Sequence, residues 1–296
     1  MTEKIAELDI VKQSWKGKVR NVYDLGDKLL IVTSDRISAF DVVFPNLIPD
    51  KGKILNAISI YFFNNTKGII NNHFITDKIE EYPDALKSFT DDLKDRSMLV
   101  KKTRVIPFEC IVRGYITGSA WSEYKKTGTV GNMMMPEDLQ ESQRFPNPLF
   151  TPSTKAESGH DENISYREMQ NRMDESLANY LKNKSLELFS YAHDKMMKDK
   201  IILADTKFEF GSIGSEVLLI DEVFTPDSSR FWDMDKYEVG KTPLSYDKQY
   251  IRDYVSSVGW DKTPPAPNLP NDVIEKTREK YIICYKIITG DVEKKW

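Results

Sequence analysis

The chain has 296 residues, of which 40% are hydrophobic and 30% are charged. This profile is typical of a globular protein with a buried core and excludes a fibre or a largely disordered tail. The 42 basic and 46 acidic side chains give a net charge of -4, which argues against a broadly basic surface for nucleic acid. The net charge does not exclude a local basic pocket for a small anion.

The N-terminus and the cysteines bear on where the protein works. Residues 1–13 include acidic side chains and no continuous apolar run, so no signal peptide is expected, and no segment is long enough to span a bilayer. Cys110 and Cys284 lie far apart without a CxxC pattern, so neither a disulfide framework nor a zinc site is indicated. We therefore expect a cytoplasmic protein with reduced thiols and no membrane contact.

The first third of the chain is predicted to be rich in strands. Short apolar runs with many β-branched residues occupy residues 28–34, 41–52 and 97–114, and Gly, Pro and Asp interrupt them. Residues 56–68 are expected to form the helix of this region. A small β-rich lobe follows from this pattern.

The rest of the chain combines helices with a hairpin. Apolar residues recur at helical spacing over residues 165–200, which predicts one or two long helices. Residues 201–211 and 216–224 are two extended runs joined by a loop with a glycine, the pattern of a β-hairpin. Beyond the hairpin we expect an irregular loop over residues 225–249, a short helix near 250–259, a proline-rich connector over 263–270 and a final helix capped by Asn271 or Asp272.

The first strand of this hairpin carries a charged face. Side chains alternate along a strand, so one face carries Asp205, Lys207 and Glu209. If Phe210 pairs with Glu216 across the loop, Asp221 lies opposite Asp205, and Glu209 lies about 13 Å further along at about 3.3 Å per residue. Three carboxylates and a lysine would then line the floor of one groove.

Carboxylates on a rigid sheet suit Mg²⁺, which takes one or two of them and leaves its other positions to water and nucleotide phosphates. This spacing suggests an orientation, with phosphates and metal near Asp221 and ribose hydroxyls near Glu209. The same alternation also fits a solvent-exposed, salt-bridged sheet face. The hairpin sequence alone leaves both possibilities open.

A second candidate is the glycine turn within residues 15–41, which is flanked by Lys16, Lys18 and Arg20. Backbone amides at such a turn, together with the cations, could cover a polyphosphate. The turn matches neither the P-loop pattern nor GxGxxG, and a plain β-turn with exposed bases is the simpler interpretation of this segment by itself.

A third candidate lies in residues 109–128, where an apolar strand delivers Arg113 and a Gly118-Ser119 pair opens an amphipathic helix. An arginine fork and the amides of a first helical turn both direct donors at an anion, which suits a phosphate monoester. The alternative is that Ser119 is an N-cap beside a surface arginine.

Two loops hold further polar candidates. Residues 150–165 contain too few apolar side chains to fold alone and form either a surface loop or a lid over a site. In residues 221–233, Asp227 and Arg230 follow the metal candidate, and the neighbouring aromatic residues could hold the loop against the body of the protein.

The histidines offer little. A lone His160 in a polar loop is more often incidental than catalytic, and neither His73 nor His193 has the spacing of a metal ligand. No arrangement of the Ser-His-Asp or Cys-His type can be argued from these positions.

Six strings occur in this order: GKVRNVYD, SDRISAFD, VRGYITGSAW, FTPSTKAESGHDENIS, DTKFEFG and DEVFTPDSSRFWD. Together they resemble the SAICAR synthetase family, especially its longer, fungal-like form, and the likeness runs nearly end to end. The resemblance implies an α+β, two-lobed SAICAR synthase-like fold. In it, a β-rich lobe over residues 1–106 binds nucleotide, an α/β lobe over residues 107–296 carries the substrate and metal site, and the ATP cleft lies between them.

The resemblance also implies a reaction. An enzyme of this family would use Mg²⁺ and ATP to join L-aspartate to the carboxylate of carboxyaminoimidazole ribotide, giving SAICAR, ADP and phosphate through an acyl phosphate, and would act as a monomer. A kinase-like phosphotransferase for a small molecule is the main alternative, and a nucleotide-binding regulatory module is a second one.

The resemblance assigns roles to individual residues in three groups. Those implied to bind ATP are Gly17, Lys18, Arg20, Lys102, Glu109 and Glu209. Those implied to bind the other substrates are Arg113 and Ser119 at the ribotide phosphate, Asp35, Ser38 and Asp41 in a substrate loop, and Lys155, His160 and Asp161 in a mobile loop. Those implied to act in catalysis are Lys207, Asp221 and Arg230, with Asp221 and Glu209 as the metal carboxylates.

Overall fold

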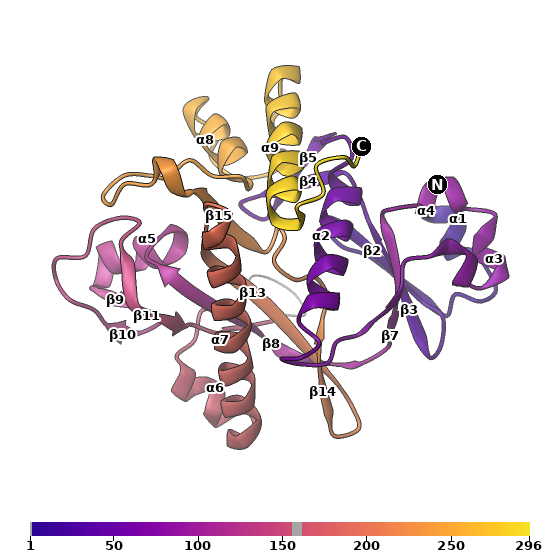
Figure 1. Ribbon diagram of the computed structural model, residues 1–296, viewed down its shortest axis with the longest axis horizontal. Coiled ribbons are helices and arrows are strands. Elements are labelled where there is room, and N and C mark those ends of the chain that lie inside the picture. Colours follow the sequence, from indigo (N-terminus) through magenta and orange to yellow (C-terminus); the bar gives the residue numbers. More distant parts are fainter. Residues whose placement is uncertain (1, 156–161) are drawn as a thin grey trace.

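The computed structural model describes residues 2–155 and 162–296 and contains two main sheets (Figure 1). The first has the order β1-β2-β3-β7-β6. Its strands are β1 (Gln13–Lys16), β2 (Arg20–Asp24), β3 (Lys28–Thr33), β6 (Phe74–Thr76) and β7 (Ser97–Lys101). The β4–β5 hairpin (Arg36–Ala39 and Val42–Leu47) stands apart from this sheet.

The second sheet has the order β11-β8-β13-β14, with β12 paired to β8 and β15 paired to β13. Its strands are β8 (Arg104–Tyr115), β11 (Arg144–Phe150), β12 (Ser153–Thr154), β13 (Ile201–Ile213), β14 (Glu216–Ile220) and β15 (Ser229–Asp233). A small β9–β10 hairpin (Thr129–Val130 and Met133–Met134) lies beside it. The predicted lobe boundary at residue 106 falls inside β8, and that division of the chain stays a prediction.

Helices fill the space around the two sheets (Figure 1). The long ones are α2 (Lys51–Asn65), α5 (Gly118–Thr127), α7 (Glu175–Lys198), α8 (Gln249–Ser257) and α9 (Asn271–Thr289). The shorter ones are α1 (Thr2–Ala6), α3 (Asp84–Lys87), α4 (Thr90–Leu93), α6 (Tyr166–Arg172) and the 3₁₀ turns η1 (Ile79–Glu81) and η2 (Met234–Lys236). The helices expected over residues 165–200 are confirmed as α6 and α7.

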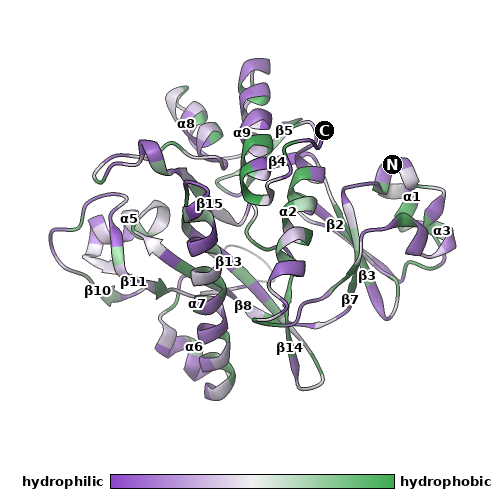
Figure 2. Ribbon diagram, in the orientation of Figure 1, coloured by the Kyte–Doolittle hydropathy of each residue, from purple (hydrophilic) through white to green (hydrophobic). Residues whose placement is uncertain are grey.

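One hydrophobic core runs through both sheets. Ile31 of β3, Phe62 of α2 and Phe208 of β13 belong to the same buried cluster. Helix α2 is buried on several sides because it packs against α9 and against strands of the first sheet. Figure 2 shows hydrophobic residues along β3 and β7, which border this core. Because both sheets share this core, their packing holds them in a fixed relation around the space between them.

A short backbone connection also joins the two sheets. Leu219 of β14 donates its N–H to the carbonyl of Asn71 (2.9 Å) and accepts a bond from the N–H of His73 (3.0 Å). The segment that leads into β6 is therefore bonded to the edge of the second sheet, two residues before Asp221. Groups on either side of this joint are held at a defined separation.

The hairpin of β13 and β14 corrects the predicted register. Ile213 pairs with Glu216, and Glu209 pairs with Ile220, so the expected pairing of Phe210 with Glu216 is wrong. The loop has two residues because Gly214, at φ +58°, supplies the positive φ that such a turn needs. Asp221 therefore does not lie opposite Asp205; it follows directly after the residue paired with Glu209.

Several predicted boundaries also change. Helix α2 begins at Lys51, five residues before the predicted start, and β15 lies within the loop expected over residues 225–249. The N-cap of α9 is Pro270, not Asn271 or Asp272, and that of α5 is Thr117.

A buried ionic cluster anchors the loop between β14 and β15. The side chain of Asp227 is 2% exposed and accepts bonds from Lys51 (2.8 Å) and Tyr281 (2.8 Å), and Lys248 Nζ lies 3.0 Å away. Burial would raise the pKa of Asp227, but the two lysines hold it well below its usual range. The loop is thereby tied to α2, α9 and the start of α8.

We expect Asp227→Asn to lower the free energy of unfolding by about 3–5 kcal/mol, because two buried lysines would lose their counter-ion. Urea denaturation measures this change. The matched control is Asp84→Asn, whose side chain is 94% exposed. Equal stability of the two variants would contradict the anchoring role.

Candidate active site

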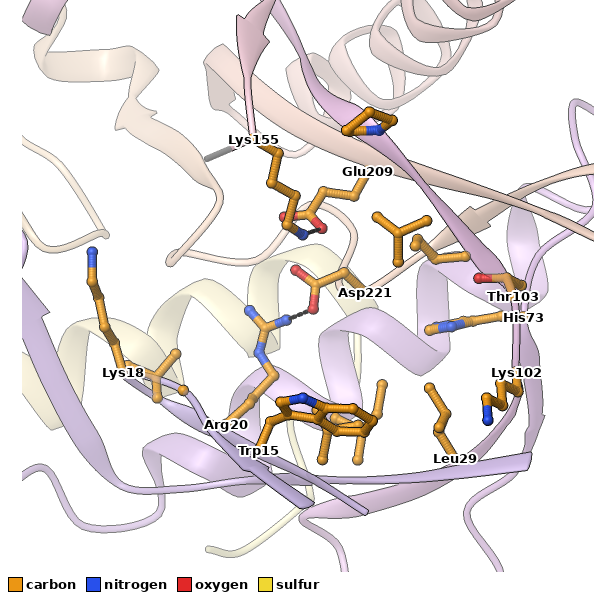
Figure 3. Close-up of a pocket in the computed structure, with 17 residues that line it drawn as sticks. Trp15, Lys18, Arg20, Leu29, His73, Lys102, Thr103, Lys155, Glu209 and Asp221 are labelled. Atoms are coloured by element: carbon orange, nitrogen blue, oxygen red, sulfur yellow. Dashed lines mark hydrogen bonds and ion pairs between the residues drawn. The ribbon is translucent and has the colours of Figure 1, made fainter. Parts of the chain in front are cut away.

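A pocket of about 1000 Å³ opens between the first sheet and the β13–β14 hairpin (Figure 3). One wall consists of apolar and basic residues from β1, β2, β3 and the turn between β1 and β2. The opposite wall comes from β13 and the end of β14, and the segment after β7 closes one side. The lining residues include Trp15, Gly17, Lys18, Arg20, Val22, Leu29, Ile31, His73, Lys102, Thr103, Lys155, Glu209, Ile220 and Asp221.

Arg20 and Asp221 meet across this pocket. The Arg20 guanidinium donates to Asp221 and also pairs with Glu222, and the Arg20 side chain is 13% exposed (Figure 3). Burial would raise the pKa of Asp221, but Arg20, with Lys207 and Lys155, holds it well below its usual range. Asp221 is thus a carboxylate, and its φ of +67° places it in the left-handed region.

A ladder of charges continues along β13. Lys207 donates to Glu209 (2.7 Å) and to Glu109 (2.5 Å), and Lys155 donates to the other oxygen of Glu209. Burial would lower the pKa of Lys207, but the two glutamates raise it well above its usual value. Because Glu209 is only 5% exposed, the alternative of a solvent-exposed sheet face is wrong.

A second cluster of charge lies further along the same strand. Asp205 accepts a bond from Arg113 (3.1 Å) and another from Arg230, and it is 4% exposed. Two guanidinium groups share this one carboxylate, so the cluster keeps a net positive charge. Arg113 also donates to Ser119 (3.3 Å) and to Thr151 (2.9 Å). Such a group attracts an anion.

Helix α5 directs its N-terminus at this cluster. Its N-cap is Thr117, whose side chain makes no capping bond, so the alternative that Ser119 is the N-cap is wrong. The alternative of a surface arginine is also wrong, because Arg113 is 5% exposed. A Cβ on Gly118 would lie 2.3 Å from Arg230 Nη2, so only glycine lets that arginine lie against the helix start. The first-turn amides and the two arginines all present donors that suit an anion, and we refer to this cluster as the candidate anion site.

The β4–β5 hairpin approaches the pocket mouth. Asp41 Oδ1 lies 2.5 Å from Nζ of Lys18 in the β1–β2 turn, and both side chains are more than half exposed. Ser38 is buried within the hairpin. Asp35 accepts bonds from Gly52 N (2.8 Å) and from Arg96 (3.1 Å), which directly precedes β7, so its observed contacts are structural.

Comparison with known proteins bears on this arrangement. The family model described as SAICAR synthetase matches residues 13–267. The chain belongs to the SAICAR synthetase family. It is 53% identical over 268 residues to the phosphoribosylaminoimidazole-succinocarboxamide synthase of Leptospira interrogans, covering 90% of this chain and 93% of that relative. It is 50% identical over 280 residues to that of Thermodesulfovibrio yellowstonii, covering 95% and 96%.

The fold agrees with a solved structure of the same family. The SAICAR synthase from Saccharomyces cerevisiae, complexed with SAICAR, superposes with a TM-score of 0.88 at 42% identity over 97% of each chain. The expected α+β, SAICAR synthase-like fold is confirmed. The chain is an ATP-dependent carbon–nitrogen ligase that joins carboxyaminoimidazole ribotide and L-aspartate in purine biosynthesis, and the kinase-like alternative is not favoured.

The structure brings most of the family's predicted site residues into two adjoining places. The pocket is lined by Gly17, Lys18, Arg20, Lys102, Lys155, Glu209 and Asp221. Arg113, Ser119 and Arg230 gather at the anion site. Glu109 pairs with Lys207, which connects the two places. His160 and Asp161 lie outside the described residues.

No helix in the described parts of the chain is long and apolar enough to cross a membrane.

His73 and Trp15 are among the pocket residues that the sequence did not indicate. His73 is 3% exposed, and its Nε2 is buried without a hydrogen-bond partner among the described residues. Burial lowers its pKa to about 4, so the ring is neutral. The pairing of this segment with β14, which no local pattern predicts, brings it to the pocket. Trp15 was also missed, although its position two residues before the glycine turn places it on the same wall.

Proposed function

We propose that the pocket binds ATP and that the Arg113–Arg230 cluster binds the phosphate of the ribotide, with phosphoryl transfer between them. The observation that carries this proposal is the continuity of β13. Asp205 at the anion site, Lys207, and Glu209 at the pocket alternate on one face of the strand. They span about 13 Å at about 3.3 Å per residue, so a single strand positions the groups of both places.

The chemistry needs activation of a poor electrophile. In the first step a carboxylate oxygen of the ribotide attacks the γ-phosphorus of ATP, the bond to the β–γ bridging oxygen breaks, and ADP leaves with the electron pair. In the second step the amino nitrogen of L-aspartate attacks the acyl carbon. The phosphate leaves with the carbon–oxygen electron pair, and the nitrogen loses a proton.

The chain's own residues orient and neutralise these groups. We assign Gly17, Lys18 and Lys102 to the nucleotide, and Arg20, Lys155 and Lys207 to the negative charge that crosses between ATP and the ribotide. No enzyme nucleophile is required. Burial raises the pKa of Cys110 to about 12, in keeping with an inert thiol.

The carboxylates of the pocket fit Mg²⁺. Asp221 and Glu209 both line it, and among the residues that the structure describes no group of three or more His, Cys, Asp and Glu could hold a metal alone. One or two carboxylates are what Mg²⁺ takes when phosphates and water complete its coordination. When bound, the ion would neutralise charge on the phosphoryl oxygens.

The substrate-facing loops complete the assignment. We propose that Ser38 and Asp41, with Lys155, His160 and Asp161, contact L-aspartate or the ribotide. The approach of Asp41 to Lys18 supports a role for that hairpin at the pocket mouth. Isotope-edited titration of L-aspartate into Asp41→Asn protein, with ADP and ribotide present, tests this contact.

We also propose that the protein is a cytoplasmic monomer that binds no nucleic acid. Two free, buried cysteines suit a reducing compartment, and the net charge of -4 disfavours nucleic acid. The likeness to the longer form of the family supports the monomer. Light scattering on the purified protein tests it, with a mass near 34.2 kDa expected.

A coupled assay for ADP tests the function. Purified protein with Mg²⁺, ATP, ribotide and L-aspartate should release ADP, and omission of any one component should stop it. Release of ADP with the ribotide but without L-aspartate, together with a stable phosphate ester, would favour a kinase. Tight ATP binding without turnover would favour a regulatory module.

We expect Gly118→Ala to raise the KM for the ribotide about tenfold, because a Cβ displaces Arg230 and strains a residue at φ +57°. Steady-state kinetics with varied ribotide measure the effect, and the KM for ATP should stay near native. The matched control is Gly68→Ala, where an added Cβ meets nothing within 4 Å. An unchanged ribotide KM would count against Arg230 at this site.

A further inference from the structure

Trp15 is a large apolar side chain that is exposed to solvent. The chain has five tryptophans, and Trp15, at 45% exposure, is the one that belongs to the exposed class. Among the described residues no aromatic ring pairs with it, whereas the other four each contact an aromatic ring. A large aromatic side chain left open at a pocket wall offers a flat apolar face to a ligand.

The register of the first sheet makes this face part of a larger surface. Trp15 pairs directly with Val22, and Val22 pairs with Ile31. Directly paired residues share one face of a sheet, and all three line the pocket. With strands about 4.8 Å apart, the row is about 10 Å wide. Ile220 lies on the opposite wall, so the space between is a slot bounded by apolar side chains on both sides.

Charge at the ends of the row indicates what enters the slot. The chain continues from Trp15 into the turn with Lys18 and Arg20, which places cations at one end (Figure 3). Lys102 and Thr103 offer polar groups at the other end. A flat ring system with an anionic tail matches this distribution, and a nucleotide has that form.

We propose that Trp15 stacks on the base of ATP and covers it from the solvent side of the slot. This inference rests on the proposed function, which puts ATP in the pocket. Stacking uses the face of the ring and no hydrogen bond, so Trp15 adds affinity for the nucleotide without choosing between purines. Selection of adenine falls to polar groups near Lys102 and Thr103.

The test compares Trp15→Ala and Trp15→Phe with the native enzyme. We expect Trp15→Ala to raise the KM for ATP about 10- to 100-fold, the range for loss of one base–aromatic stack. The kcat at saturating ATP and the KM for the ribotide should stay within about twofold, since Trp15 lies on the far wall from the anion site. Trp15→Phe, which keeps a smaller ring, should lie between. The matched control is Trp296→Phe at the C-terminus.

Direct binding separates this inference from the proposed function. ADP should quench the tryptophan fluorescence of the native protein and of Trp296→Phe, and should quench Trp15→Phe much less. Calorimetry with ADP supplies the affinities independently of turnover. If the native protein fails to bind ADP, the placement of ATP in the pocket is wrong. If native protein and Trp15→Ala bind ADP equally, the stacking role alone is overturned.

Discussion

Asp221→Asn is expected to reduce kcat about 10²- to 10³-fold or more, the loss seen when one preorganised electrostatic contact to a transition state is removed. The substitution keeps the size of the side chain but removes the charge that faces the pocket. Arg20 retains Glu222 as a partner, so the fold should remain intact. Steady-state kinetics and circular dichroism of the same preparation measure both effects.

The structural reason lies in the position of Asp221. Its carboxylate is held ionised by Arg20, and it lines the pocket together with Glu209, the other carboxylate proposed for Mg²⁺. Asp84→Asn makes the same chemical change at a 94% exposed side chain and should leave kcat unchanged. Near-native turnover of Asp221→Asn would remove the basis for a metal site here. Raised Mg²⁺ demand in the variant would support it.

Arg113→Ala is expected to raise the KM for the ribotide about 10- to 100-fold, because a charged hydrogen bond to the phosphate is lost. The KM for ATP should change little, since Arg113 lies at the far end of the charged face of β13. Arg113→Lys keeps the charge but not the fork and should recover only part of the loss. Varied-ribotide kinetics at saturating ATP and L-aspartate measure these values.

Ser119→Ala is expected to raise the ribotide KM less than Arg113→Ala does at the same site. It removes one neutral hydroxyl that contacts Arg113 at 3.3 Å, so a KM change of about fivefold is expected. Arg172→Ala, on a 45% exposed side chain of α6, serves as the arginine control. A ribotide KM that stays native in Arg113→Ala would refute the phosphate site.

Local patterns in the sequence predict much of this fold, because they encode periodicity and turn chemistry directly. The alternation on β13 correctly places Asp205, Lys207 and Glu209 on one face, and the helical spacing predicts α7. The register of the hairpin could not be derived from alternation alone. The expected pairing of Phe210 with Glu216 leaves a five-residue loop, whereas the tight turn at Gly214 has two residues and places Ile213, three residues further along, opposite Glu216.

The candidate site depends on contacts between distant parts of the chain, and local sequence patterns do not predict such contacts. The turn after β1 suggested cations for a polyphosphate, but nothing local predicts that Arg20 pairs with Asp221, 201 residues away. His73 shows the same limit, since its place in the pocket depends on pairing with β14. Arg113 and Ser119 were predictable because the strand-to-helix passage that unites them is contiguous.

In the proposed mechanism the ribotide carboxylate takes the γ-phosphoryl group of ATP before L-aspartate attacks. Transfer of ¹⁸O from ribotide labelled in both carboxylate oxygens tests it most directly, with the inorganic phosphate analysed by mass spectrometry after complete turnover. We expect one ¹⁸O atom in each phosphate and one retained in the amide of SAICAR. Phosphate that carries no ¹⁸O would contradict an acyl phosphate and with it the proposed mechanism.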